Sequence, residues 1–80
     1  MVNYSKVFSN TSWFNVAADG VDYVLQVKKG AIFAKVSAAM PTSADGAFEL
    51  EAKEGMNSSI LSGNLWVRSV DGSGLIVYAK

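Results

Sequence analysis

The sequence contains no cysteine and no histidine, and only one proline. Without cysteine the fold can hold no disulfide and no cysteine-ligated zinc. Without histidine it lacks the commonest metal ligand and the usual general base near neutral pH. Lysine and arginine together number 7, as do aspartate and glutamate, which argues against a nucleic acid or an anionic membrane bound mainly through charge. We therefore expect no nucleic-acid partner and no membrane partner.

Long apolar runs are also lacking. The longest are a handful of residues, far below the roughly 20 that a membrane-spanning helix needs. The start of the chain, Met1–Ser12, has no continuous apolar region and no small-residue cleavage site, so a signal peptide is not expected. We expect synthesis in the cytoplasm and action as a complete polypeptide.

The composition that remains is globular. The chain has 80 residues, of which 50% are hydrophobic and 18% charged. This length allows a single domain over residues 1–80. A chain so short buries only about 60% of its unfolded surface, so its core is expected to be small.

Strand signals dominate the order of the residues. Short runs rich in Val, Ile, Tyr, Phe and Trp are separated by Gly, Asn, Asp and Ser, which is typical of short strands. We expect an all-β antiparallel sandwich or barrel of seven to eight strands. The predicted strands are Ser5–Phe8, Trp13–Ala17, Asp22–Lys28, Ala31–Ser37, Ala47–Ala52, Ser59–Leu61, Leu65–Val70 and Leu75–Ala79.

One segment, Ser43–Met56, has residues that a helix would tolerate. Gly46 and Gly55 weaken that interpretation, and Phe48–Ala52 alternates between apolar and polar residues, which favours a strand. Three connections have turn chemistry and predict tight hairpins: Lys28–Gly30, Val70–Gly74 and Ser62–Asn64. Gly30 is expected at positive φ between two paired strands.

Alternation assigns one face of each strand to the core. The predicted core residues are Tyr23, Leu25, Val27, Ile32, Ala34, Val36, Phe48, Leu50, Leu65, Val67, Leu75 and Val77. The opposite face is less polar than a solvated surface normally is. Its predicted members, which we expect to form a subunit interface, are Val24, Trp66, Arg68, Val70, Ile76 and Tyr78. Arginine with Trp and Tyr is typical of interface hot spots. The alternative is that a second sheet, formed by the N-terminal strands with Trp13 and Phe14, covers this face within the monomer.

No arrangement of residues predicts catalysis. Ten serines are present, but the usual base for a serine nucleophile is missing. Glu49 and Glu51 share one face of a predicted strand, where a solvated surface explains them better than a carboxylate pair across a cleft. Asp19–Asp22 lacks the ligand series of a calcium loop. We expect no enzyme activity, no catalytic or metal-binding residues and no cofactor.

Several short segments carry a resemblance to a known group of proteins. They are Val27–Phe33, Met40–Gly46, Gly55–Asn57, Leu65–Ser69 and Asp71–Val77. With their Pro-Thr loop and their Trp-x-Arg-Ser strand before the last turn, residues 20–80 resemble small β-sandwich virion proteins of tailed bacteriophages. Residues 1–18 have no counterpart in that pattern and are expected to form an attachment arm.

The resemblance implies a head-decoration or tail-accessory protein that is often trimeric and is not an enzyme. It therefore predicts a structural protein located in the virion after synthesis in the host cytoplasm. The predicted partners are other virion proteins and further copies of the chain, with a trimer as the first expectation. The alternative function is a carbohydrate-binding module for a host-surface glycan, with Trp13 or Trp66 as the sugar platform. A small enzyme is a third and more distant alternative.

Overall fold

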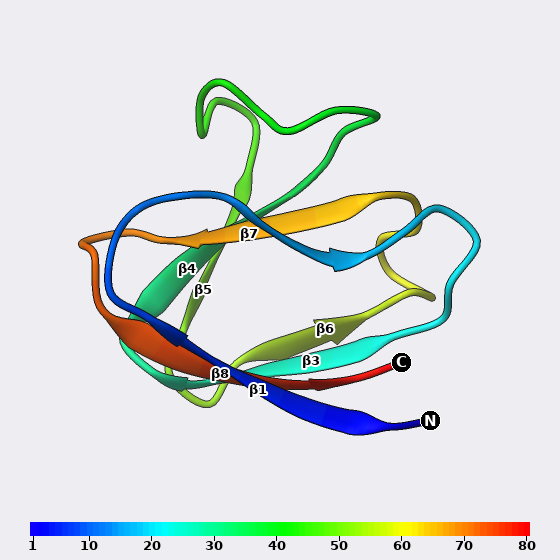
Figure 1. Ribbon diagram of the computed structural model, residues 1–80, viewed down its shortest axis with the longest axis horizontal. Helices are drawn as coiled ribbons and strands as arrows, with labels where there is room; N and C mark the ends of the chain where they lie inside the picture. The colour runs from blue at the N-terminus through cyan, green and yellow to red at the C-terminus, as the bar shows by residue number, and fades with distance from the viewer.

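The computed structural model describes all residues, 1–80, and contains eight strands and no helix (Figure 1). The predicted all-β class is therefore confirmed. The strands are β1 (Asn3–Phe8), β2 (Phe14–Ala17), β3 (Val24–Lys29), β4 (Ala31–Val36), β5 (Phe48–Glu51), β6 (Gly55–Asn57), β7 (Leu65–Ser69) and β8 (Gly74–Ala79).

The strands form two four-stranded antiparallel sheets, and the fold is a small β-sandwich. One sheet, called the β1-sheet below, has the order β1-β8-β3-β6, and the other, the β2-sheet, has the order β2-β7-β4-β5. In Figure 1 the strands of the β1-sheet run along the lower side, with β2 and β7 above them. Segment 43–56 contains strands and turns, so the strand interpretation of this segment is confirmed.

Almost every connection passes from one sheet to the other. Only β4 and β5 are consecutive strands that are also hydrogen-bonded neighbours. The three predicted hairpins are therefore wrong as hairpins, because each joins strands of opposite sheets. Gly30 does have the predicted positive φ, 73°. A glycine at positive φ turns the chain but does not select the strand that follows as a pairing partner, and here it makes a corner between the sheets.

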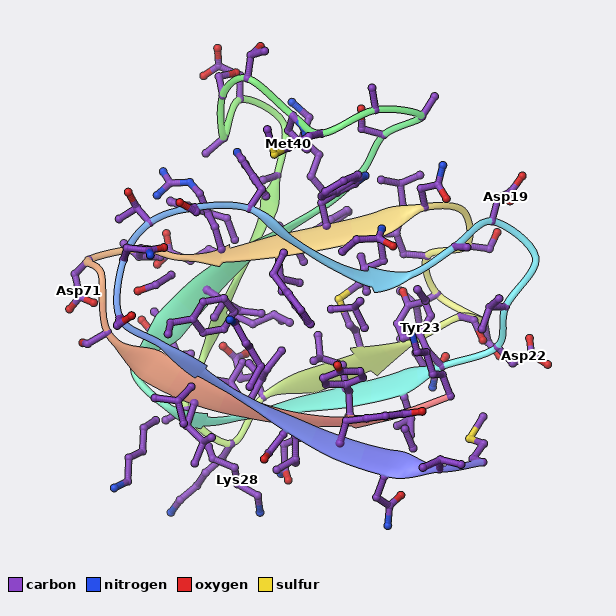
Figure 2. The ribbon with its side chains drawn as sticks, viewed as in Figure 1. Asp19, Asp22, Tyr23, Lys28, Met40 and Asp71 are labelled. Atoms are coloured by element: carbon purple, nitrogen blue, oxygen red, sulfur yellow. The ribbon has the colours of Figure 1, made fainter.

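Alternation predicted the interior face of the central strands correctly. Tyr23, Leu25, Val27, Ile32, Ala34, Leu65 and Val67 are all buried in the core, while Val36 and Leu50 pack against it. Figure 2 shows Tyr23 between the two layers. Its hydroxyl donates a hydrogen bond to the carbonyl of Leu61 at 2.5 Å, so this buried phenol is satisfied.

The last strand, β8, buries the face that was predicted to point outward. Ile76 is fully buried, whereas Leu75 and Val77 are only half-buried. Opposite residues of an antiparallel pair point to the same side of a sheet. Ile76 pairs with Val27 and Tyr78 pairs with Leu25, so Ile76 and Tyr78 must share the interior. β8 is apolar on both faces, and its alternation could not decide between them.

Two other predictions fail at the edges. Phe48 was expected in the core, but it is the first residue of edge strand β5 and is 58% exposed. The predicted strand Ser59–Leu61 is a turn, in which the amides of Ile60 and Leu61 both bond to the carbonyl of Asn57. The strand lies earlier, at Gly55–Asn57, where it pairs with Val24–Gln26.

The N-terminal segment is part of the sandwich and not a separate arm. β1 pairs with β8 along its whole length, and Val2 and Lys80 exchange two backbone hydrogen bonds beyond the last pair. Phe8, Val16 and Ala17 belong to the core. Residues 1–18 therefore supply one edge strand to each sheet.

A hydrogen-bonded cluster closes the corner between β7 and β8. The buried Ser69 hydroxyl accepts from the Gly72 amide at 2.8 Å and donates to the Ser73 carbonyl at 2.6 Å. Asp71, on the surface at this corner (Figure 2), accepts from the amide and the hydroxyl of Ser73 at 3.1 and 3.0 Å. These bonds favour the carboxylate form, led by the Ser73 amide, and they lower the pKa of Asp71.

This pKa shift predicts a pH dependence of stability. A carboxyl group whose pKa is lower in the folded state stabilises the fold above its unfolded pKa, here about 3.8, and loses that contribution as pH falls through the folded value. The difference in unfolding free energy between the native chain and Asp71→Asn should therefore shrink as pH is lowered from about 6 to about 2. Urea titrations of both proteins at several pH values measure it. A difference that stays constant over this range contradicts the prediction.

Candidate binding face

The outer face of the β2-sheet gathers aromatic and cationic side chains from neighbouring strands. Because Ile32, Ala34, Leu65 and Val67 point inward, the residues between them point outward. The register places Phe33 opposite Arg68 and Lys35 opposite Trp66. Trp13 comes directly before β2 and lies over Arg68. We call Trp13, Phe33, Lys35, Trp66 and Arg68 the arginine–aromatic face.

Arg68 is at the centre of this face. Its guanidinium carbon lies 4.8 Å from the ring centre of Phe33 and 5.6 Å from that of Trp13. Both distances are within the range of a cation–π interaction. Nη1 also donates to the carbonyl of Ser69 at 2.9 Å. Contacts from both sides of β7 therefore hold the guanidinium in one position on the sheet.

Trp66 is held in a similar way. Its Nε1 donates to the carbonyl of Ser37 at 3.0 Å, so the polar group of the indole is satisfied inside the protein. Trp13, Phe33, Trp66 and Arg68 are all half-buried, so each leaves part of its surface exposed. Rigid aromatic rings and an oriented guanidinium lose little conformational freedom on binding, which suits them to protein interfaces.

The structure does not bring the six predicted interface residues together. Trp66 and Arg68 share the arginine–aromatic face, and Val70 follows directly after β7. Val24 lies on the other sheet, where it is 47% exposed. Ile76 is in the core, so it is not available to a partner. Tyr78 turns toward the interior, 5.2 Å from the ring of Tyr4 and 6.0 Å from that of Phe14.

Sequence reasoning missed the two aromatic partners of Arg68. Phe33 alternates with core residues Ile32 and Ala34, so its outward direction was available from the pattern. The contact of Trp13 with Arg68 was not, because it depends on the pairing of β2 with β7. The Tyr4–Tyr78–Phe14 cluster was missed because Tyr4 meets Tyr78 only through the pairing of β1 with β8. Burial raises the pKa of Tyr78, and the neighbouring Tyr4 hydroxyl adds to the shift.

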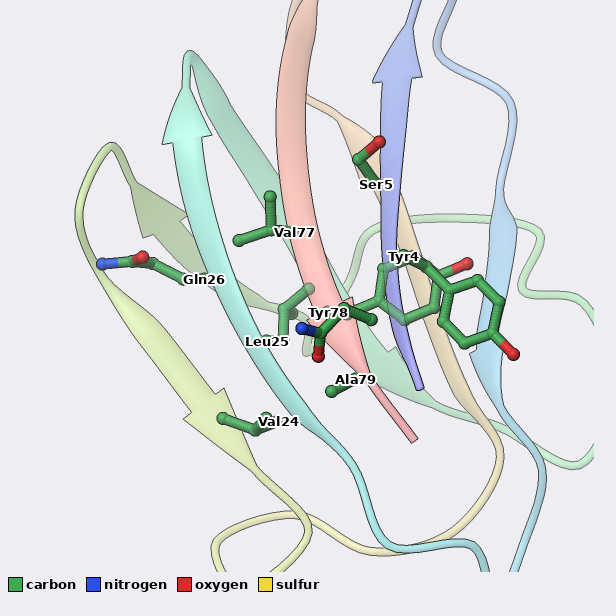
Figure 3. A pocket seen from close by; sticks show the side chains of 9 residues that line it. Tyr4, Ser5, Val24, Leu25, Gln26, Val77, Tyr78 and Ala79 are labelled. Carbon is green, nitrogen blue, oxygen red and sulfur yellow. The ribbon is translucent and has the colours of Figure 1, made fainter. Parts of the chain in front are cut away.

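A second feature lies on the outer face of the β1-sheet. A shallow groove of about 510 Å³ crosses β1, β8 and β3. Figure 3 shows Ser5 on β1, Val77 on β8, and Val24 and Gln26 on β3 along it. Its lining residues are Asn3, Tyr4, Ser5, Val24, Leu25, Gln26, Val77, Tyr78 and Ala79, none of which is charged. The groove therefore offers apolar contact without a charged group that would define a substrate.

The structure contains no group of three or more His, Cys, Asp or Glu side chains placed to hold a metal ion. None of its elements is a helix with the length and apolar character needed to cross a bilayer. Glu49 and Glu51 are exposed on β5. Comparison of the chain with family models, with curated proteins and with solved structures found no match.

Proposed function

We propose that the protein is a non-enzymatic structural component of a tailed-bacteriophage particle, where it binds other virion subunits as capsid decoration or as a tail accessory. The observation that carries the proposal is the arginine–aromatic face. Arg and Trp held half-exposed on a rigid sheet are the residues most enriched at protein contacts. The resemblance of residues 20–80 to phage β-sandwich proteins supplies the setting. In a particle, many identical copies would multiply a weak contact through avidity.

Incorporation into particles tests the proposal. The protein should be found by mass spectrometry in phage particles purified by density gradient, and its absence there contradicts the virion role. In an infection complemented with tagged protein, Arg68→Glu should lower the incorporated copy number at least about tenfold, as expected for a hot spot. Lys28→Glu makes the same charge change at an exposed position on the other sheet and should incorporate normally. Equal incorporation of both variants excludes the arginine–aromatic face as the contact.

Carbohydrate binding is the second candidate, favoured by the placement of Trp13 and Trp66 on one face. Half-exposed aromatic rings on a sheet can stack against sugars, although both indoles here also have protein contacts. A glycan-array signal that is lost in Trp13→Ala or Trp66→Ala, with the circular dichroism spectrum unchanged, would establish this function. If the array gives no signal, the glycans that it displays are excluded as ligands.

A further inference from the structure

Strand β1 presents an open hydrogen-bonding edge. Val2 and Lys80 exchange two backbone bonds, so alternate residues along β1, beginning with Tyr4 and Lys6, also bond to β8. The backbone groups of Asn3, Ser5 and Val7 consequently point away from β8. None of the backbone hydrogen bonds of the turns and loops involves them. Asn3, Ser5 and Val7 are exposed, Val7 at 69%.

The other edges of the sandwich are short, irregular or doubly charged, whereas β1 is long and regular and carries a single charge. β6 has only three residues. β5 has two exposed carboxylates, Glu49 and Glu51, and β2 has four residues with a shift of register near Ala17. Short length, charge and bulges are the usual protections of sheet edges. β1 has six residues in regular register and no proline. Its one charge, Lys6, is directed over the Phe14 ring at 5.1 Å.

We propose that two copies of the chain pair through β1, antiparallel and around a two-fold axis at Ser5, to form one continuous eight-stranded sheet. In this register Ser5 lies opposite Ser5 of the second copy, and Asn3 lies opposite Val7. Each of these pairs exchanges two backbone hydrogen bonds, so all the outward groups of Asn3, Ser5 and Val7 are satisfied.

The position of Lys6 favours this register over a shift of two residues that would bring like charges together. On the inward-facing side of β1 this register places Lys6 opposite the uncharged Tyr4 of the second copy, so no like charges lie directly opposite each other in this pair. A shift by two residues in one direction places Lys6 opposite Lys6, and like charges directly opposite each other are unfavourable. A shift in the other direction leaves the outward groups of Val7 without a partner in the strand.

The surface beside the β1 edge is uncharged and would extend the proposed contact between the two copies. The groove shown in Figure 3 begins at Ser5 and crosses to Val77 and Val24, so no charged side chain of the groove opposes the approach of a second copy. The net charge of the chain is zero, so long-range repulsion between copies is small. A two-fold contact is closed, because it uses the β1 edge of both copies, and the short β6 edge at the far side does not favour further growth of the sheet. The result is a dimer and not the trimer that the phage resemblance implies.

Proline at Ser5 is a selective test. The Ser5 amide points outward, so Ser5→Pro removes a donor of the proposed contact without removing a bond between β1 and β8. The dimer dissociation constant should rise at least about tenfold, because two hydrogen bonds per dimer are lost. Ser5→Ala, which keeps the amide, should dimerise like the native chain. Analytical ultracentrifugation measures the constants, and an equal effect of the two substitutions overturns the proposal.

Cysteine cross-linking tests the register and does not depend on how Ser5→Pro folds. The chain has no cysteine of its own. Opposite residues of a hydrogen-bonded antiparallel pair have Cα atoms about 5.5 Å apart, within disulfide range. Ser5→Cys should form a covalent dimer on mild oxidation, whereas Asn3→Cys and Val7→Cys alone should not. An equimolar mixture of Asn3→Cys and Val7→Cys should form the mixed disulfide.

Three results of these experiments would contradict the proposed dimer. A mass of 8.5 kDa at every concentration up to about millimolar, a trimer, or equal cross-linking at Asn3, Ser5 and Val7 overturns the two-fold contact. These measurements use purified protein and do not rest on the proposed function. A monomer that is found in particles refutes only the dimer, and a dimer that is absent from particles refutes only the virion role.

Discussion

Ile76→Ala is expected to lower the free energy of unfolding by about 2–5 kcal/mol. Ile76 is fully buried in the core, opposite Val27 on one side and Lys6 on the other. Removal of its branched side chain leaves a cavity between two packed sheets. The whole stability of a domain this small is of the order of 5 kcal/mol, so the variant should retain only about 0–3 kcal/mol and unfold at much lower urea concentration. Urea denaturation followed by Trp fluorescence measures the loss.

Val24→Ala is the matched control for this substitution. Val24 lies on the same sheet but faces outward at 47% exposure, so the change should stay within about 0.5 kcal/mol. The pair compares a buried position with an exposed position on the same sheet. If Ile76→Ala kept its stability and only reduced the mass of an oligomer, Ile76 would be the interface residue that alternation predicted, and the observed face of β8 would be contradicted.

Gly30→Val is expected to destabilise the protein by more than about 1 kcal/mol, for two separate reasons. The φ angle of 73° is strained for a β-branched residue. A Cβ atom at Gly30 would also lie 3.1 Å from the Ser73 carbonyl oxygen and 3.3 Å from the Gly74 Cα atom. Both contacts are with backbone, so they cannot be relieved by rotating a side chain. The two corners of the sandwich, β3–β4 and β7–β8, would have to separate.

Gly46→Val has only the first of these two effects, so comparison with it separates them. Gly46 has nearly the same φ, 75°, but a Cβ atom there would meet nothing within 4 Å. Its melting temperature should fall because of backbone strain alone, and that of Gly30→Val should fall further. Equal decreases in melting temperature for the two variants would show that the β3–β4 and β7–β8 corners are not in contact. An unchanged melting temperature for Gly30→Val would exclude a positive φ at Gly30.

Gly30 also shows how far local patterns reach. The residues Lys28–Gly30 predicted a turn, and a turn is present with the expected φ. The same residues were equally compatible with a hairpin and with a corner between sheets. The choice between them depends on Val27 and Ile32, which enter one core from opposite sheets. That contact requires β7 and β8, which lie far along the chain and were not part of the local pattern.

For the candidate site, alternation placed Trp66 and Arg68 on one outer face, because β7 has a clear apolar side and only one face can be buried. Alternation misplaced Ile76 and Tyr78, because β8 is apolar on both faces and its direction is set by pairing with β3. The contacts of Arg68 could not be predicted, since Phe33 lies on β4 and Trp13 directly precedes β2, and only the sheet order makes these strands the neighbours of β7.

The sequence by itself determined the all-β class, most of the strand positions and the buried face of the strands with a clean alternation. These properties follow from side chains interacting with water and with near neighbours, so they are present in short segments. The tertiary structure decided which sheet each strand joins, which face of β8 is buried, where Arg68 finds its aromatic rings and which edge stays open. Backbone hydrogen bonds are chemically the same for every strand, so pairing is selected only when the two sheets close on a shared core.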